Sequence, residues 1–300
     1  MVRKLSSRSN SESENVRIFD TFRFLNELDV LELRLNILNE WVDYFVITES
    51  RLTVSGIPKD LVFQKNKSRF KAFESKIIYN VIDEVPLSFD HLCRRQDYYT
   101  NFSDIDLNCG LPFNEIPLPY KRDMYERDHS IDPLLSSNLT MRDFDIILSS
   151  DIDEIPNPLR FKQLQRMRTD EIYIFVQLAF LYKLNLLYHK RWLGTRAVRW
   201  SYLRNSSMHQ LRNQVDISKR IKRGGWHWSW LGDAEHFKEK LQAQPEISFN
   251  TIENAMSAHE KVSLRLDPFN RKLSMPRIRV GRKFPLFLRE NIGRYSGLVE

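Results

Sequence analysis

Three acidic side chains at the end of an apolar run are the residues most able to do chemistry. Asp151, Asp153 and Glu154 directly follow residues 145–150, whose β-branched apolar side chains predict a buried strand. Ligands of open α/β sheets bind at the carboxyl ends of such strands. Clustered carboxylates repel one another unless a cation lies among them, and their oxygens suit Mn²⁺ or Mg²⁺ rather than zinc. The stretch therefore predicts a divalent metal site for a phosphorylated ligand.

The Asp-x-Asp spacing is a weak signal by itself. The pairs Asp104/Asp106 and Asp143/Asp145 have the same spacing. The first lies in a polar stretch with no strand before it, and the second lies at the amino end of the predicted strand. The pair that begins at Asp151 is the one placed where such a sheet binds ligands. The competing interpretation is a chance pair of solvated acids.

Strand and helix patterns alternate along the first half of the chain. Asn26 is expected to cap a helix whose leucines recur at helical spacing on one face. The alternation predicts an α/β fold. Strands are expected at 16–22, 42–48, 76–82, 145–150, 171–180 and 196–202, and helices at 121–139 (interrupted at Pro133), 158–168 and 233–244.

Composition and charge are those of a globular protein. The 300 residues are 42% hydrophobic and 28% charged, and the net charge of +7 is concentrated in residues 183–223 and 265–294. Such charge suits nucleic acid, an anionic membrane surface or a pyrophosphate substrate, although a solvated face is commoner. No nucleic-acid-binding signature accompanies it, so no nucleic-acid partner is expected.

The ends and insertions of the chain carry little signal. Residues 1–15 are polar and are expected to be disordered, and 87–120, which contains Cys93 and Cys109, reads as a long loop or insertion. Two cysteines do not make a disulfide framework. No secretory signal or transmembrane segment is recognised, which predicts a cytoplasmic protein, with peripheral membrane association left open.

A second unusual stretch places three tryptophans around one histidine. Residues 224–232 read Gly-Gly-Trp-His-Trp-Ser-Trp-Leu-Gly. Aromatic clusters of this density build either core or a wall on which a sugar stacks. His227 could bind a metal through a neutral ring nitrogen, although a lone histidine more often has a structural role.

These blocks together resemble glycosyltransferase family 17. The resemblance is spread over about residues 17–300, and its blocks occur in the family's order. It is carried by residues 24–34, 42–50, 150–156 and 225–230, by Glu235 shortly afterwards, and by the tail at 285–288.

The resemblance implies a GT-A-like glycosyltransferase fold with a Rossmann-like, mostly parallel central sheet. It implies one catalytic domain over 16–300, with a nucleotide-binding half at about 16–160 and an acceptor half at about 161–300. The best-known member of the family is an inverting β-1,4-N-acetylglucosaminyltransferase that uses UDP-N-acetylglucosamine with Mn²⁺. Its animal relatives carry a membrane anchor that is not recognised in this sequence, so the shorter bacterial or viral members are the nearer comparison.

The resemblance also assigns site residues. Asp151 and Asp153 match the family's metal-binding DXD motif, and His227 would complete the metal shell. An ion held there would neutralise the departing pyrophosphate. Contacts to the nucleotide are expected from Glu49, Ser150, Asp151, Arg127 and Trp226.

An inverting transfer needs a general base on the acceptor hydroxyl. Glu235 is the first candidate, because it matches a family glutamate after the tryptophan block, and Asp233 is the second. For both, the competing interpretation is a carboxylate at a helix N-terminus.

Two other functions compete with the transferase. A metal-dependent phosphodiesterase or nuclease could use the same acids to activate water, although no second acidic cluster is recognised for a second ion. A binding module with a degenerate site is the third. The acceptor, a glycan or another glycoconjugate, and the oligomeric state are not specified by the sequence.

Overall fold

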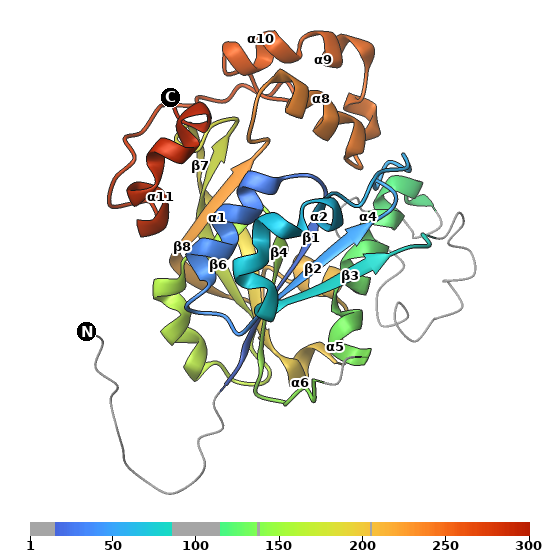
Figure 1. Cartoon of the computed structure of the whole chain (residues 1–300), viewed down its shortest axis with the longest axis vertical. Coiled ribbons are helices and arrows are strands. Elements are labelled where there is room, and N and C mark those ends of the chain that lie inside the picture. The colour runs from blue at the N-terminus through green and yellow to red at the C-terminus, as the bar shows by residue number, and fades with distance from the viewer. Residues whose placement is uncertain (1–15, 86–114, 137–138, 205) are drawn as a thin grey trace, which may run out of the picture.

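The computed structural model describes residues 16–85, 115–136, 139–204 and 206–300, and it forms one eight-stranded sheet with helices around it (Figure 1). The strand order is β3-β2-β1-β4-β7-β6-β8-β5. The strands are β1 (Ile18–Phe24), β2 (Tyr44–Ser50), β3 (Ile77–Ile82), β4 (Ile146–Asp151), β5 (Glu154–Pro156), β6 (Tyr173–Leu181), β7 (Leu187–Arg199) and β8 (Lys219–Ser229).

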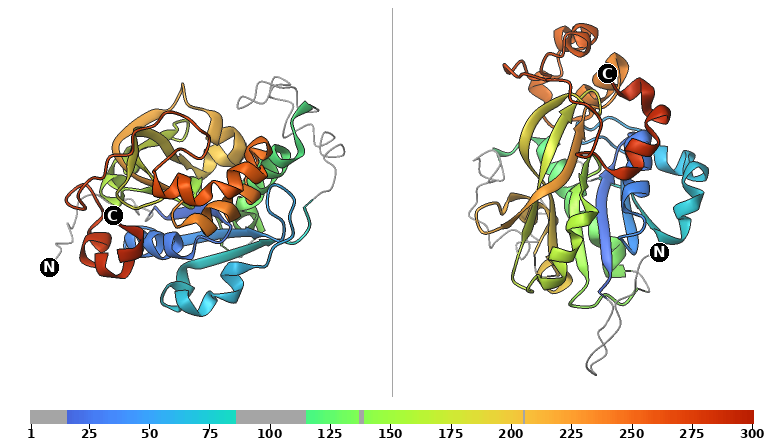
Figure 2. Two further views of the ribbon diagram at one scale, coloured as in Figure 1. Left: turned by 90° about the horizontal axis from the view of Figure 1, so that it is seen from above. Right: turned by 90° about the vertical axis from the view of Figure 1, so that its left-hand side faces the viewer.

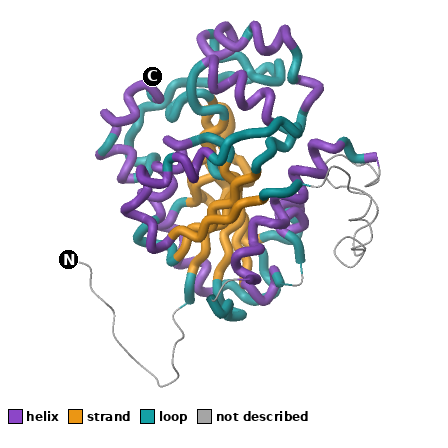
Figure 3. The backbone as a smooth tube through the Cα atoms, turned by 45° about the vertical axis from the view of Figure 1, so that its right-hand side comes forward, coloured by secondary structure: helices purple, strands orange, loops and turns teal. Residues whose placement is uncertain are grey.

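The helices cover both faces of the sheet and one of its ends (Figures 2 and 3). The α-helices are α1 (Leu28–Leu38), α2 (Val62–Lys65), α4 (Leu118–Asp128), α5 (Asp132–Ser136), α6 (Trp200–Leu203), α7 (Met208–Asn213), α8 (Ala234–Ala243), α9 (Ile252–Met256), α10 (Ala258–Ser263) and α11 (Leu286–Glu290). The 3₁₀ segments are η1 (Lys67–Lys76), η4 (His129–Ile131), η5 (Pro158–Arg166), η6 (Ile247–Phe249) and η7 (Ile292–Leu298).

The first four strands form a parallel sheet in which β1, β2 and β4 are buried on both faces, whereas β3 at the edge is half-buried. On β1, Phe22 points into the core that α1, η1 and α11 cover, whereas Phe19 points into the core under α5, α6 and α7. A strand buried on both faces reads as a nearly continuous apolar run, which is why these strands were recognisable in the sequence. The α/β class is therefore confirmed.

The second half of the sheet corrects the expectation of a mostly parallel sheet. β7 is antiparallel to both β4 and β6, and β5 is antiparallel to β8, whereas β6 and β8 are parallel. Only five residues, 182–186, connect β6 to β7, and a parallel pair needs a much longer crossover. The sheet is mixed, and its likeness to a GT-A core remains a prediction.

Several local expectations are refined. The helix α1 is preceded by Glu27 as its N-cap residue rather than by Asn26, whose side-chain amide instead donates to Glu239. The strand expected at 196–202 is only the end of the longer β7, because α6 begins at Trp200. Asn157 and Pro158 do start a helical segment, but it is 3₁₀.

Other expectations lie outside the described residues. These are the disorder of residues 1–15, and Asp104, Asp106, Cys93 and Cys109 in the expected 87–120 insertion. In the part of the chain that the structure describes, no helix is long and apolar enough to cross a membrane.

The tryptophan-rich stretch forms β8, and its side chains alternate between two environments. Trp226 and Trp228 are buried and stack with ring centroids 6.0 Å apart. Next to them, Gly225 has φ +136°, and a Cβ on it would lie 2.1 Å from the carbonyl oxygen of Ile155 in β5. The close pairing of β5 with β8 therefore requires glycine at this position.

The substitution Gly225→Ala is expected to lower the free energy of unfolding by about 2 kcal/mol or more, because the new methyl group meets β5 in a strained backbone conformation. Urea unfolding followed by circular dichroism measures this. Gly293→Ala is the matched control, since nothing lies within 4 Å of its added Cβ. Equal stability of the two variants would contradict the described β5–β8 pairing.

Candidate functional site

A pocket of about 530 Å³ lies at the carboxyl edge of the parallel strands. Arg23 at the end of β1 is in register with Asp151 at the end of β4, and Ser50 ends the neighbouring β2. Residues of α4, α7, α8, β7 and β8 contribute to the rest of the lining. The acidic turn predicted from the sequence is therefore at the ligand-binding edge, as expected.

The backbone of the acidic turn is held by Arg34 of α1. This guanidinium group is fully buried, and it donates to both carboxylate oxygens of Asp20, at 2.8 and 2.7 Å. It also donates to the carbonyl oxygens of Asp151 and Ile152, at 3.0 and 2.9 Å, and to the Ser150 hydroxyl at 2.6 Å. One side chain thus fixes the position of the turn relative to β1.

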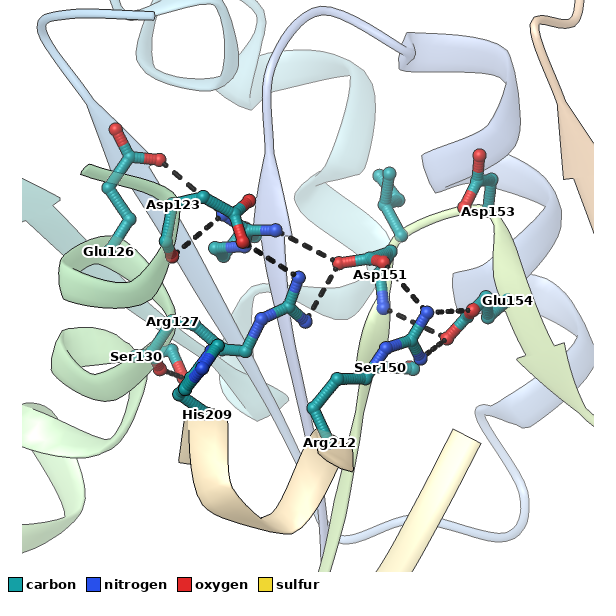
Figure 4. Close-up of polar contacts among 12 residues, drawn as sticks. Asp123, Glu126, Arg127, Ser130, Ser150, Asp151, Asp153, Glu154, His209 and Arg212 are labelled. Carbon is teal, nitrogen blue, oxygen red and sulfur yellow. Dashed lines mark hydrogen bonds and ion pairs between the residues drawn. The ribbon is translucent and has the colours of Figure 1, made fainter. Parts of the chain in front are cut away.

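Three arginines from three different elements surround Asp151, and Figure 4 labels two of them, Arg127 and Arg212. Its carboxylate lies 3.1 Å from Arg23 of β1 and 3.1 Å from Arg127 of α4, and 3.4 Å from Arg212 of α7. These positive charges outweigh burial and hold the pKa of Asp151 well below its usual value. Asp151 is therefore ionised and shares a cluster of guanidinium groups.

Glu154 positions one of those arginines. Its fully buried carboxylate accepts two hydrogen bonds from Arg212, both of 2.7 Å, and one of 2.7 Å from the indole nitrogen of Trp192. It also accepts a 3.3 Å hydrogen bond from the backbone nitrogen of Asp151. The third acid of the cluster therefore lies in β5 and orients Arg212.

Asp153 lies at the other side of the turn, between a lysine and a histidine. Lys240 of α8 donates to it at 3.2 Å, and the Nε2 atom of His227 lies 3.5 Å away. These charges hold the pKa of Asp153 below its usual value despite its burial. The His227 ring stacks on Trp192, with centroids 4.4 Å apart, and its Nδ1 atom is buried without a partner among the described residues.

The expected metal ligands lie together in the pocket, but they do not form a metal site as arranged. Asp153 and His227 face each other, whereas Asp151 is turned toward the arginines. Over the ranges that the structure describes, no three or more His, Cys, Asp and Glu side chains are grouped so as to hold an ion. Mn²⁺ or Mg²⁺ at this turn would share the Asp151 carboxylate with the arginines that contact it.

Three residues expected to contact the nucleotide do not line the pocket. Glu49 is fully buried, and its carboxylate accepts from Lys59, from Tyr79 and from backbone nitrogens at the start of α2. Ser150 accepts from Arg34. Trp226 packs in the core and donates its indole N–H to the Lys283 carbonyl.

The two candidate bases are also outside the pocket lining. Asp233 caps α8, accepting from the backbone nitrogens of Glu235 and His236, and the Glu235 carboxylate pairs with Lys238 on the exposed side of the helix. The alternative interpretation, carboxylates at a helix N-terminus, is the one that the structure favours.

The pocket contains charged residues that were not predicted from the sequence as site residues. Arg23, Arg212, Lys240 and Glu126 all line it. Arg212 lies in the basic region 183–223 and Lys240 in a predicted helix. Their positive charge was the only feature of the sequence that could have indicated a place in the site. Their convergence depends on long-range packing of α4, α7 and α8, which spacing does not reveal.

The comparison with protein families matches the N-terminal part of the chain. The model of glycosyltransferase family 17 matches residues 4–104. Over these residues the resemblance to glycosyltransferase family 17 is confirmed. The match covers β1, α1, β2 and β3 and ends before the acidic turn, and it supports a glycosyltransferase activity. No curated protein matches the chain.

Removing the Arg34 guanidinium is expected to destabilise the fold strongly. In Arg34→Met the Asp20 carboxylate stays buried without its partner, and breaking such a pair costs about 3–5 kcal/mol. Denaturant unfolding measures the loss. The double variant Asp20→Asn/Arg34→Met should be less destabilised than the sum of the two single variants. Strict additivity would show that the two groups do not interact.

Proposed function

We propose that the chain is a glycosyltransferase that binds a nucleotide-sugar donor in the 530 Å³ pocket. The observation that carries the proposal is the convergence of Arg23, Arg127 and Arg212 on the turn after β4. Planar guanidinium groups bind phosphate oxygens through paired, charge-assisted hydrogen bonds. The family match supports the reaction class.

In glycosyl transfer from a nucleotide sugar, the pocket must stabilise the departing nucleoside diphosphate. As the bond between the sugar and the diphosphate breaks, negative charge grows on the phosphate oxygens, and positioned cations lower the energy of that state. Arg212 is held for this role by Glu154, and Lys240 by Asp153. The proposed donor is UDP-N-acetylglucosamine and the proposed acceptor a glycan hydroxyl, both on the basis of the resemblance.

Dependence on Mn²⁺ or Mg²⁺ stays a prediction. The acids that would hold the ion are Asp151 and Asp153, with His227 as the third ligand. When bound, the ion would supply positive charge next to the diphosphate. The residues of the chain supply such charge themselves, through the arginines and Lys240.

The donor proposal is tested by a hydrolysis and binding screen over UDP-, GDP- and CMP-sugars. One nucleotide class is expected to bind and to be turned over. Arg127→Gln should weaken binding of that nucleotide about tenfold or more, because a charge-assisted hydrogen bond is lost. Arg204→Gln, which removes the same charge from an exposed pair with Asp143, is the matched control.

Absence of binding and turnover for every nucleotide sugar would contradict the transferase. Cleavage of nucleic acid in the same assays would instead support the competing phosphodiesterase.

Metal dependence is tested by calorimetric titration of UDP in Mn²⁺ and in EDTA, with the wild type and Asp153→Asn. If an ion bridges the turn and the diphosphate, affinity should fall in EDTA and in the variant, and Asp143→Asn should behave as the wild type. Equal affinity under all these conditions would contradict metal dependence. It would assign binding of the diphosphate to the arginines and Lys240.

A further inference from the structure

One buried carboxyl group of the pocket has no role in the function proposed above. Glu126 of α4 lines the pocket and is only 7% exposed. Its Oε2 atom lies 3.9 Å from Arg23, whereas its Oε1 atom has no hydrogen-bond partner among the described residues (Figure 4). A buried acceptor without a donor is costly, so such a group calls for a ligand or a water molecule.

The groups around Glu126 come from three elements. Arg23 of β1 and Lys59, in the loop after β2, are the cations, Asp123 of α4 is the neighbouring acid, and the Ser50 hydroxyl of β2 favours the charged form of the carboxyl group. Burial dominates over the two cations and raises the pKa of Glu126 to about 7. The carboxyl group therefore changes its charge near neutral pH.

The strand order indicates which part of the donor meets Glu126. The ends of β2, β1 and β4 follow one another along the sheet edge and present Ser50, Arg23 and Asp151 in that order. If the diphosphate contacts the arginines around Asp151, a donor lying along the edge brings one of its two ends, the nucleoside or the sugar, to Ser50 and Glu126. UDP carries the nucleoside without the sugar, so its binding tells the two ends apart. This step rests on the proposed function.

We propose that Glu126 binds the nucleoside of the donor, its Oε1 atom accepting a hydrogen bond from a ribose hydroxyl or from an N–H group of the base. Ribose and base offer the same chemistry, a neutral hydrogen-bond donor. The bound donor favours the ionised carboxylate, so binding lowers the pKa of Glu126 and releases a proton when the free group is protonated. Affinity therefore rises as the pH rises to about 7 and levels off above it.

Calorimetric titration of UDP between pH 5.5 and 8.5 tests this, with the wild type compared with Glu126→Gln. At pH 8 the variant should bind about tenfold more weakly, because a hydrogen bond to a charged group is lost. The difference should shrink toward pH 5.5, where the wild-type carboxyl is itself neutral. Titrations in two buffers of different ionisation enthalpy should show more proton release in the wild type than in the variant, which keeps only the release from the terminal phosphate of UDP.

Two further variants serve as controls. Glu290→Gln removes an exposed carboxylate and should leave the UDP affinity and its pH profile unchanged. Ser50→Ala removes the hydroxyl that favours the charged form, so it should move the midpoint of the wild-type profile to higher pH. Repeating the titration with 2′-deoxy-UDP separates the sources. A loss of affinity in the wild type but not in Glu126→Gln assigns the ribose 2′-hydroxyl as the partner of Glu126, whereas equal affinity of the wild type for UDP and 2′-deoxy-UDP assigns the base or the other ribose hydroxyl.

The inference is overturned if Glu126→Gln, folded as judged by its thermal unfolding, binds UDP with the affinity, pH profile and proton release of the wild type. An unmoved midpoint in Ser50→Ala would also overturn it, by assigning the titration to another group. Binding of UDP with these results rejects Glu126 and leaves the transferase intact, whereas no binding of any nucleotide by the wild type rejects both.

Discussion

The buried pair of Arg34 and Asp20 is the interaction on which the site depends. Both side chains are fully excluded from solvent, so neither charge is tolerable without the other. Because the guanidinium has donors to spare after binding Asp20, it also satisfies the carbonyl groups of the turn that ends β4. A sharp turn at a sheet edge would otherwise leave those carbonyls without partners. The helix α1, the strand β1 and the acidic turn are thereby fixed as one unit.

Around this fixed backbone, a chain of ion pairs balances the charges of the acidic and basic side chains. Glu154 holds Arg212, Arg212 reaches Asp151, and Asp151 also binds Arg23 and Arg127. Each carboxylate keeps a cation in place, and each cation keeps an acid ionised. A site organised in this way needs little rearrangement of the protein when a charged ligand arrives, which is the condition for strong electrostatic stabilisation.

The sequence predicted the parts of this site that are local in the chain. The acidic turn was found because an apolar strand and its end are contiguous residues. Glu235, the predicted base, does not line the pocket, because closeness to the tryptophan block in the sequence is not closeness in the pocket. Lys240, five residues later, lies about 140° around the helix from Glu235, and it is the residue that reaches Asp153.

The strand β8 shows what a sequence pattern can predict and what it cannot. Side chains alternate along a strand, so Trp226 and Trp228 share the core face while His227 and Ser229 line the pocket. That alternation was readable once residues 219–229 were known to be a strand, and it would have excluded Trp226 as a nucleotide contact. The antiparallel half of the sheet and the convergence of α4, α7 and α8 arise from packing between distant segments, which a single sequence does not encode in any local pattern.

A crystal structure of the chain with bound UDP tests the central claim most directly. We expect the diphosphate within hydrogen-bonding distance of Arg127 and Arg212, beside the turn that Arg34 holds. A nucleotide bound elsewhere, with these arginines still paired only to Asp151 and Glu154, would contradict the assignment of this pocket as the donor site.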